Sequence, residues 1–214
     1  MKKNSYLLCL DLEATCQKQF LIQPQEIIHF AAVLIKRDTF ESVAVFDEVV
    51  RPVHNPVLSE FCKSLTGLTQ DAVNDAEPFP VVLSHFFDWL KEHHLFNNFT
   101  VVTWSNWDLT VCLPNQCALS DVPIPYCFKH WCNLKFLVNR VTGVHPKVSL
   151  KDIVTKFYGL PWVGLEHNGV DDATNLAQLL PFYAGVGQFL PITHLTDSAR
   201  RKWHYLQRQY FVNK

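Results

Sequence analysis

Two carboxylates stand close together near the N-terminus, directly after a short apolar run. Residues 6–10 are apolar or aromatic, and Asp11 and Glu13 follow at positions i and i+2. Because side chains alternate across a strand, both carboxylates would project from the same face of a strand that continues through them. Two like charges side by side destabilise a sheet unless a cation lies between them, so the pair predicts a divalent metal site. The alternative from these residues alone is a strand end that meets solvent.

Three further side chains suit the same chemistry. Asp108 follows an apolar stretch, and His167 and Asp172 flank the start of a helix predicted over 170–180. Each also has a simpler explanation. Asp108 could be a helix N-cap, and Asp171 or Asp172 could complement a helix dipole. His167 could be a hydrogen-bonded loop histidine.

The combination is what phosphodiester hydrolysis requires. That reaction needs an activated water, neutralisation of the transition-state charge and help for the leaving 3′-oxygen, which two divalent ions about 3.5–4 Å apart supply together. Four carboxylates balance the charge of two dications. Hard oxygen ligands favour Mg²⁺ or Mn²⁺ over softer metals.

The remaining pattern indicates a mixed sheet packed against helices. Strands are predicted at 6–10, 27–35, 43–50 and 99–104, with 126–128 as a weak fifth. Helices are predicted at 56–65, 69–73, 78–90, 109–113, 130–141, 149–157 and 170–180. Three closely spaced strands imply antiparallel pairing, and the later helix–strand alternation implies parallel strands whose carboxyl ends carry functional groups.

Composition points to one globular domain inside a cell. Of 214 residues, 48% are hydrophobic and 18% are charged, which excludes a disordered chain. No apolar run approaches the length that a bilayer requires, and the first strand begins too early for a cleaved signal peptide, so we expect no membrane association. The odd number of seven cysteines favours reduced thiols and an intracellular location, cytoplasmic or nuclear. A zinc site is a weaker alternative, because its cysteines match zinc spacings only loosely: Cys112, Cys117, Cys127 and Cys132.

Two segments are locally basic although the net charge is only −1. Residues 129–156 carry six lysines and arginines against one acidic residue, and the chain from His194 onward carries five against one. The tail also interleaves aromatic residues such as Trp203 and Tyr205. These segments predict either a polyanion-binding face or an ordinary solvated surface with a packed terminal helix.

Taken together, the motifs resemble those of the DEDDh 3′→5′ exonucleases. The resemblance rests on Asp11-Leu12-Glu13-Ala14-Thr15, on Trp107-Asp108-Leu109 and on His167-Asn168-Gly169-Val170-Asp171-Asp172. The DEDDy branch would place a tyrosine nearer the last aspartate, and none lies between Tyr158 and Tyr183. Further motifs are similar to those of the Eri-1 group of RNases: Pro24-Gln25-Glu26-Ile27-Ile28, Arg51-Pro52-Val53 and Thr66-Gly67-Leu68-Thr69.

The resemblance, which spans about 6–182, implies an RNase H-like fold. Its mixed five-stranded sheet would have three antiparallel strands, then parallel strands, and helices on both faces. We expect the exonuclease domain over 1–190 and a basic, aromatic tail over 191–214, packed on the same domain. Some relatives carry an N-terminal SAP domain that binds RNA stem-loops; the segment before the first strand is too short for one, so stem-loop specificity is not implied.

The resemblance also implies a role for each site residue. Asp11 would bridge two Mg²⁺ ions, Glu13 and Asp172 would bind the first ion, and Asp108 would hold the second through water. His167 would be the general base, because its ordinary pKa suits proton transfer near neutral pH. Mn²⁺ is expected to support activity as well.

The expected activity is removal of nucleoside 5′-monophosphates from single-stranded or overhanging 3′ ends. The terminal nucleotide would lie against Leu12, Ala14 and Thr15, with Leu65 and Trp107 stacking on the last bases; Trp107 could equally be a core residue. RNA is favoured over DNA by the resemblance alone. The alternatives are a DEDDh nuclease acting mainly on DNA and, less favoured, a non-catalytic nucleic-acid-binding module.

Overall fold

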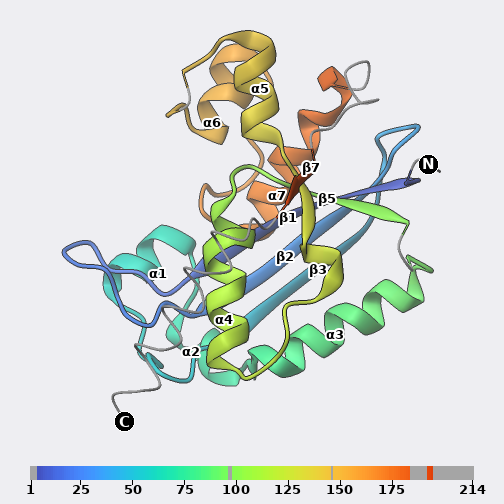
Figure 1. Ribbon diagram of the computed structural model, residues 1–214. Coiled ribbons are helices and arrows are strands. Elements are labelled where there is room, and N and C mark those ends of the chain that lie inside the picture. Colours follow the sequence, from blue (N-terminus) through green and yellow to red (C-terminus); the bar gives the residue numbers. More distant parts are fainter. Residues whose placement is uncertain (1–3, 96–97, 146, 184–191, 195–214) are drawn as a thin grey trace.

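The computed structural model describes residues 4–95, 98–145, 147–183 and 192–194, and its centre is a mixed β-sheet (Figure 1). Within these residues the sheet has seven strands in the order β4-β3-β2-β1-β5-β6-β7. The strands are β1 Tyr6–Ala14, β2 Ile27–Lys36, β3 Ser42–Arg51, β4 Glu77–Pro78, β5 Phe99–Thr103, β6 His130–Asn133 and β7 Ile192–His194. The α-helices are α1 Glu60–Thr66, α2 Gln70–Asp75, α3 Phe79–Glu92, α4 Leu113–Leu119, α5 Leu134–Thr142, α6 Leu150–Asp152 and α7 Gly169–Gln178. Shorter or wider turns of helix are η1 Asp108–Cys112, η2 Tyr126–Phe128, η3 Ile153–Phe157 and η4 Leu180–Tyr183.

The strand directions confirm the predicted mixed sheet. The first three strands pair in antiparallel fashion, β1 with β2 and β2 with β3, and β5 and β6 then continue the sheet parallel to β1. The short strands β4 and β7 extend these five central strands at either edge. β1 therefore lies in the middle of the sheet, with neighbours on both sides.

The predicted position of the fifth strand was wrong. Residues 126–128 form the 3₁₀ turn η2, and the strand is β6, which occupies the start of the helix predicted over 130–141. β6 is a strand because its backbone pairs with β5, from Val101↔Trp131 to Thr103↔Asn133. Helix α5 begins only after Asn133, whose side chain accepts the Phe136 N–H at 3.0 Å as an N-cap. Non-local pairing thus overrode a locally helical pattern.

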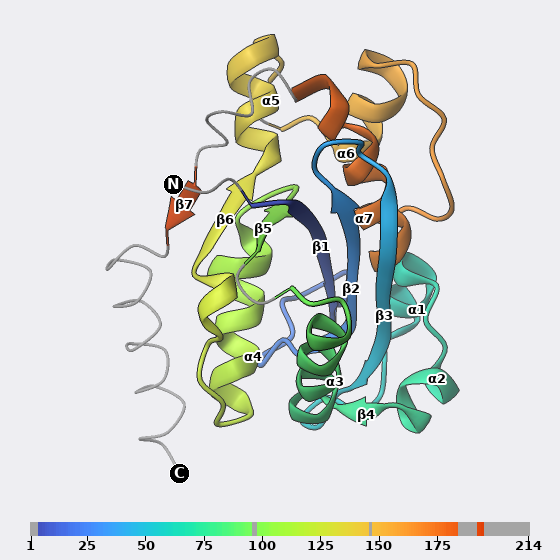
Figure 2. The same cartoon turned by 90° about the vertical axis from the view of Figure 1, so that its right-hand side faces the viewer.

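Helices cover both faces of the sheet, and the alternation of β1 decides which face each of its side chains enters (Figures 1 and 2). Leu8, Leu10 and Leu12 pack in the core cluster that includes α3 and α4. Leu7 and Cys9 pack in the opposite cluster, which includes α5, α6 and α7. Because the alternation continues along β1, the next two side chains on the α7 face are carboxylates.

The C-terminal segment is described only in part. Residues 192–194 form β7, which pairs with β6, while the basic and aromatic residues of the predicted tail lie outside the described residues. The boundary at residue 190 therefore stays a prediction. Among the described residues, no helix combines the length and the hydropathy that crossing a bilayer would require.

The first testable prediction concerns the aromatic core beneath α3. Phe86 is fully buried and stacks on Phe30 and Phe128, with ring centroids 4.8 and 5.5 Å apart. We expect Phe86→Ala to lower the free energy of unfolding by about 3–5 kcal/mol, because it leaves a cavity between α3 and the sheet. Phe136→Ala on the exposed side of α5 should change it by about 0.5 kcal/mol or less. Urea unfolding measures both, and equal effects would contradict this view of the core.

Candidate active site

The site is built on the part of β1 that extends beyond its parallel neighbour. β1 pairs with β5 only as far as Cys9↔Val102, whereas its pairing with β2 continues to Ala14. Asp11 and Glu13 lie in this extension, opposite Ala31 and His29 of β2, so both are inside the strand and not after it. The divergence of β1 and β5 leaves backbone groups of β1 open to other partners, as is usual where ligands bind at the carboxyl ends of strands.

Asp108 is held against this extension by the backbone of β1. It follows β5 after four residues and begins the π-helical turn η1, a kind of turn that is frequent at functional sites. The Leu12 N–H donates to Asp108 Oδ1 at 3.3 Å, and Asp108 is only 6% exposed. The predicted aspartate after the fourth strand therefore lies beside the predicted pair on the first.

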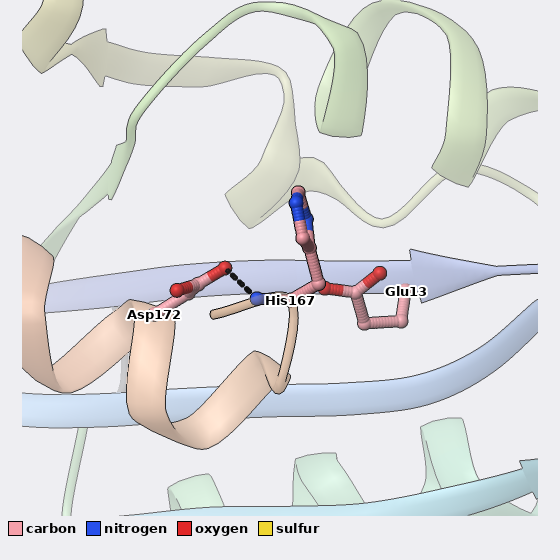
Figure 3. Close-up of side chains that lie close together, drawn as sticks. All are labelled: Glu13, His167 and Asp172. Atoms are coloured by element: carbon pink, nitrogen blue, oxygen red, sulfur yellow. Dashed lines mark hydrogen bonds between the residues drawn. The ribbon is translucent and has the colours of Figure 1, made fainter. Parts of the chain in front are cut away.

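The third part of the site comes from the start of α7 (Figure 3). Asp172 lies in the first turn of this helix, and the His167 backbone N–H donates to its Oδ2 at 3.1 Å. Donor atoms of Glu13, His167 and Asp172 all lie within 4.8 Å of one another. Glu13 is more than 150 residues away from His167 and Asp172 in the sequence, and the packing of α7 on β1 and β2 brings them together.

Asp171 has a different role from its neighbour Asp172, because its carboxylate binds the loop before α7. Its Oδ2 accepts the Leu165 N–H at 2.8 Å and so ties the loop before α7 to the helix. Gly164 in that loop has φ +67°, and a Cβ there would lie 2.1 Å from the Asp171 carboxyl. The loop can approach Asp171 this closely only with glycine at 164. The geometry agrees with the resemblance, which assigned Asp172 and not Asp171 to the site.

Burial raises the pKa of all four carboxyl groups, and the charges of the other carboxyls in the site add to this for Asp11 and Glu13. Burial raises the pKa of Glu13 to about 9, with further contributions from Asp172 and Asp108. The pKa of Asp11 lies well above its usual range because of burial and then the charges of Asp108, Glu13 and Asp172. Burial raises the pKa of Asp172 to about 7 and that of Asp108 to about 6. Four acids with raised pKa values in one place would be stabilised in their ionised forms by a bound cation.

The donor atoms fit a hard divalent cation. Oδ1 of Asp172 is buried and has no hydrogen-bond partner within the described part of the molecule, although buried oxygens normally have one. Carboxylate oxygens are the ligands that Mg²⁺, Mn²⁺ and Ca²⁺ prefer. His167 is exposed and has φ +64°, a left-handed conformation that is uncommon outside glycine and often marks a functional position.

The predicted nucleotide-binding residues divide into two groups. Leu12, Ala14 and Thr15 are 3%, 6% and 2% exposed, and the Thr15 hydroxyl accepts the Glu26 N–H at 3.0 Å. Contact of a nucleotide with these three residues stays a prediction; because their side chains are buried, a ligand here would meet mainly their backbone. Leu65 is half-buried, and Trp107, next to Asp108, is 37% exposed and so is not a core residue.

Two further features predicted from the sequence are the cysteines and the basic segment. Cys112 and Cys117 belong to the cluster on one face of the sheet and Cys132 to the cluster on the other, so the zinc alternative is wrong. In the basic segment 129–156, the Lys135 and Lys151 ammonium groups lie 5.7 Å from the ring centroids of Trp104 and Trp162. These lysines are aromatic-stacked cations, not freely solvated ones.

Sequence reasoning missed one contributor, His29. It is buried in β2 opposite Glu13, and its ring nitrogens contact Asp47 and Gly169. A signal was available, because His29 is the only polar side chain in the apolar run 27–35. A lone histidine in a buried strand is a residue that needs hydrogen-bond partners.

Comparison with known proteins decides the family. The Exonuclease (RNase_T) family model matches residues 8–180. The chain belongs to this exonuclease family. It is 37% identical to ERI1 exoribonuclease 3 of Homo sapiens over 182 residues, which are 84% of this chain and 53% of that protein.

Two solved structures agree with this assignment. The nuclease domain of 3′hExo, a DEDDh family member bound to rAMP, is 33% identical with a TM-score of 0.83, over 90% of this chain and 98% of that one. A 3′-exonuclease structure on recognition of the histone mRNA stem-loop is 31% identical with a TM-score of 0.81, over 91% and 87%. The resemblance to Eri-1-like DEDDh exonucleases and the RNase H-like fold are confirmed. The family is divalent-metal-dependent, and the chain spans about half the length of the curated relatives it matches.

A second prediction concerns the charge of Asp11. We expect Asp11→Asn to raise the melting temperature of the metal-free protein, because it removes the carboxyl that is coupled to all three others. Mn²⁺ at 100 times its Kd should stabilise wild type by about 2.7 kcal/mol and the variant by much less. Thermal unfolding with EDTA or Mn²⁺ measures this, with Asp38→Asn in an exposed turn as the control. An equal Mn²⁺ effect in wild type and Asp11→Asn would contradict the site.

A third prediction follows from the raised pKa values of Glu13 and Asp172, about 9 and about 7. Between about pH 5 and 7 both acids, and between about pH 7 and 9 Glu13, hold protons in the folded state that they have lost in the unfolded state. Stability of the metal-free protein should therefore fall as pH rises through this window. Urea unfolding in EDTA at pH 5, 7 and 9 tests the slope, which should be shallower in Glu13→Gln. A slope unchanged by Glu13→Gln would show that the carboxyls are not coupled in this way.

Proposed function

We propose that this protein is a 3′→5′ exoribonuclease that hydrolyses single-stranded 3′ ends with two Mg²⁺ ions held by its four carboxylates. The observation that carries the proposal is the convergence of Glu13, His167 and Asp172 beside Asp11, in a chain of the RNase_T family. Mn²⁺ is expected to replace Mg²⁺. The products are nucleoside 5′-monophosphates.

The four carboxylates have distinct positions toward the ions. Asp11 is the residue we assign to both ions, because its pKa is raised by each of the other three carboxyls. Glu13 and Asp172 would hold one ion with it, and the unpartnered Oδ1 of Asp172 is a free ligand atom for that purpose. Asp108 would hold the second ion through water. When bound, two such ions neutralise the phosphate charge and stabilise the attacking and leaving oxygens.

His167 is the proposed general base. It is exposed, so its imidazole can accept the proton of a water that attacks the terminal phosphodiester. Its backbone N–H holds Asp172 Oδ2, so the residue that moves the proton also orients a ligand. His167 has a left-handed backbone, and a nitrogen of its ring lies within 4.8 Å of carboxylate oxygens of Glu13 and Asp172.

The proposed substrate is the 3′ end of a single strand, with RNA preferred to DNA. The preference for RNA is supported by the similarity to ERI1 exoribonuclease 3. The similar nuclease domain that was solved with bound rAMP supports a terminal ribonucleotide as the ligand. The backbone of residues 12–15 is the proposed seat of that nucleotide. Trp107 is the proposed stacking platform, because it is exposed and adjoins Asp108; Leu65 would contact the same base.

We also propose an intracellular location, cytoplasmic or nuclear. All seven cysteines are free thiols, and five of them are buried. Disulfide formation is the usual fate of paired cysteines in oxidising compartments, so a chain with seven free thiols suits a reducing one.

The fourth prediction tests this function. A 5′-labelled single-stranded RNA should be shortened stepwise from its 3′ end in Mg²⁺ or Mn²⁺ and left intact in EDTA. His167→Ala should lower kcat by about 10²- to 10⁴-fold, and Asp11→Asn should abolish turnover. His94→Ala, in the turn before β5 at the opposite end of the sheet, is the histidine control and should match wild type.

Gel-resolved degradation of matched RNA and single-stranded DNA separates the outcomes. Preference for the DNA would overturn the substrate assignment. Wild-type protein that degrades neither strand with any divalent ion would overturn the nuclease itself, in favour of a binding module.

A further inference from the structure

A buried histidine links the outer strands of the sheet to the start of α7. His29 of β2 is 3% exposed, and its Nε2 lies 2.6 Å from Oδ1 of Asp47 on β3. On the other side of the ring, the Gly169 N–H donates to His29 Nδ1 at 3.3 Å. The three groups form a continuous chain of hydrogen bonds from β3 through β2 to α7.

These contacts fix the tautomer of His29. Gly169 can only donate at this position, so Nδ1 must be unprotonated and accept. Nε2 then carries the ring proton and donates it to the Asp47 carboxylate, which can only accept when ionised. Each end of the ring therefore has one partner of the right polarity, and neither nitrogen is left unsatisfied.

The contact falls on a backbone group that would otherwise lack an acceptor. Gly169 is the first residue of α7, and the first N–H groups of a helix have no intrahelical partner. The approach is close, since a Cβ at 169 would lie 3.0 Å from His29 Nδ1 and 3.1 Å from the Ala31 Cβ. α7 thus begins in direct contact with β2 at the residues opposite Asp11 and Glu13.

The position of this contact relates it to the candidate active site. Glu13 is the cross-strand neighbour of His29 in β1. His167 lies two residues before Gly169, and Asp172 lies three residues after it. A shift of the α7 start would therefore move His167 and Asp172 together relative to Glu13.

We propose that His29 is a positioning residue, which with Asp47 fixes the first turn of α7 so that Asp172 and His167 face Glu13 at ligand distance. The role rests on the proposed function, because it matters for activity only if these three residues form the active site. His29 itself contacts neither substrate nor metal in this role. It acts through the Gly169 N–H.

Two variants separate the two ends of the ring. His29→Phe replaces the imidazole with a somewhat larger apolar ring and removes both hydrogen bonds. His29→Asn places an amide oxygen near the position of Nδ1, so it keeps an acceptor for Gly169 and loses Asp47. The matched control is His85→Phe, because His85 Nδ1 pairs with Glu48 Oε2 at 3.0 Å on the exposed side of α3, away from α7.

The readouts are the Kd for Mn²⁺ alone by calorimetry, kcat and KM on single-stranded RNA, and amide hydrogen exchange at the start of α7. We expect His29→Phe to weaken Mn²⁺ binding and to lower kcat by about 10- to 100-fold each, as other supporting residues of metal sites do. KM should change about twofold or less, and exchange at Gly169 should accelerate. His29→Asn should recover part of each loss, and His85→Phe should behave as wild type.

A merely structural role predicts a different pattern. If His29→Phe melts at a lower temperature but binds Mn²⁺ and turns over as wild type does, the inference is wrong. If His29→Phe does not fold, the second variant is Asp47→Ala, which changes the half-exposed carboxylate that accepts the hydrogen bond from His29. It should weaken Mn²⁺ binding and accelerate exchange at Gly169, and wild-type values for both would overturn the inference.

Failure of the proposed function is distinguishable from failure of this inference. Wild-type protein without nuclease activity would refute the function, while Mn²⁺ affinity and hydrogen exchange in the His29 variants would still decide whether His29 positions α7.

Discussion

The structure depends on a conflict between four carboxyl groups and the low-dielectric space in which the fold places them. Burial raises the pKa of every one of these acids above its ordinary value, and the charges of nearby carboxylates raise those of Asp11, Glu13 and Asp172 further. The two acids of β1 cannot separate, because they share one face of a strand held in place by its neighbours. A bound divalent cation would relieve this conflict. The strands and helices around the acids hold them together in the absence of the cation.

Backbone N–H groups do much of this holding. Asp108 receives the N–H of Leu12, which β1 can offer because β5 has already diverged from it. Asp172 receives the N–H of His167 and also lies in the first turn of α7, where the helix dipole favours negative charge. These contacts lower the free energy of the ionised forms, so they offset part of the repulsion without occupying every ligand oxygen.

Much of this arrangement could be predicted from local sequence. The alternation of a strand places Asp11 and Glu13 on one face, and the resemblance to the DEDDh motif assigns Asp172 and not Asp171 to the site. The fifth central strand could not be found in this way, since β6 is only four residues long and is a strand because of its pairing with β5. The prediction that a nucleotide lies against Leu12 and Ala14 did not take their burial into account, although it follows from the alternation that places them on the face opposite Asp11 and Glu13.

His29 shows why the rest required the structure. Its partners lie on β3 and at the start of α7, 18 and 140 residues away in the chain. The sequence signal is only that a polar side chain interrupts an apolar strand, which says that partners must exist but not which ones. The register of β1, β2 and β3 supplies the answer: it brings Glu13, His29 and Asp47 near one another across three strands, from β1 to β3. The face of the sheet that carries Asp11 and Glu13 is therefore also the face on which His29 contacts the start of α7, the helix that carries Asp172.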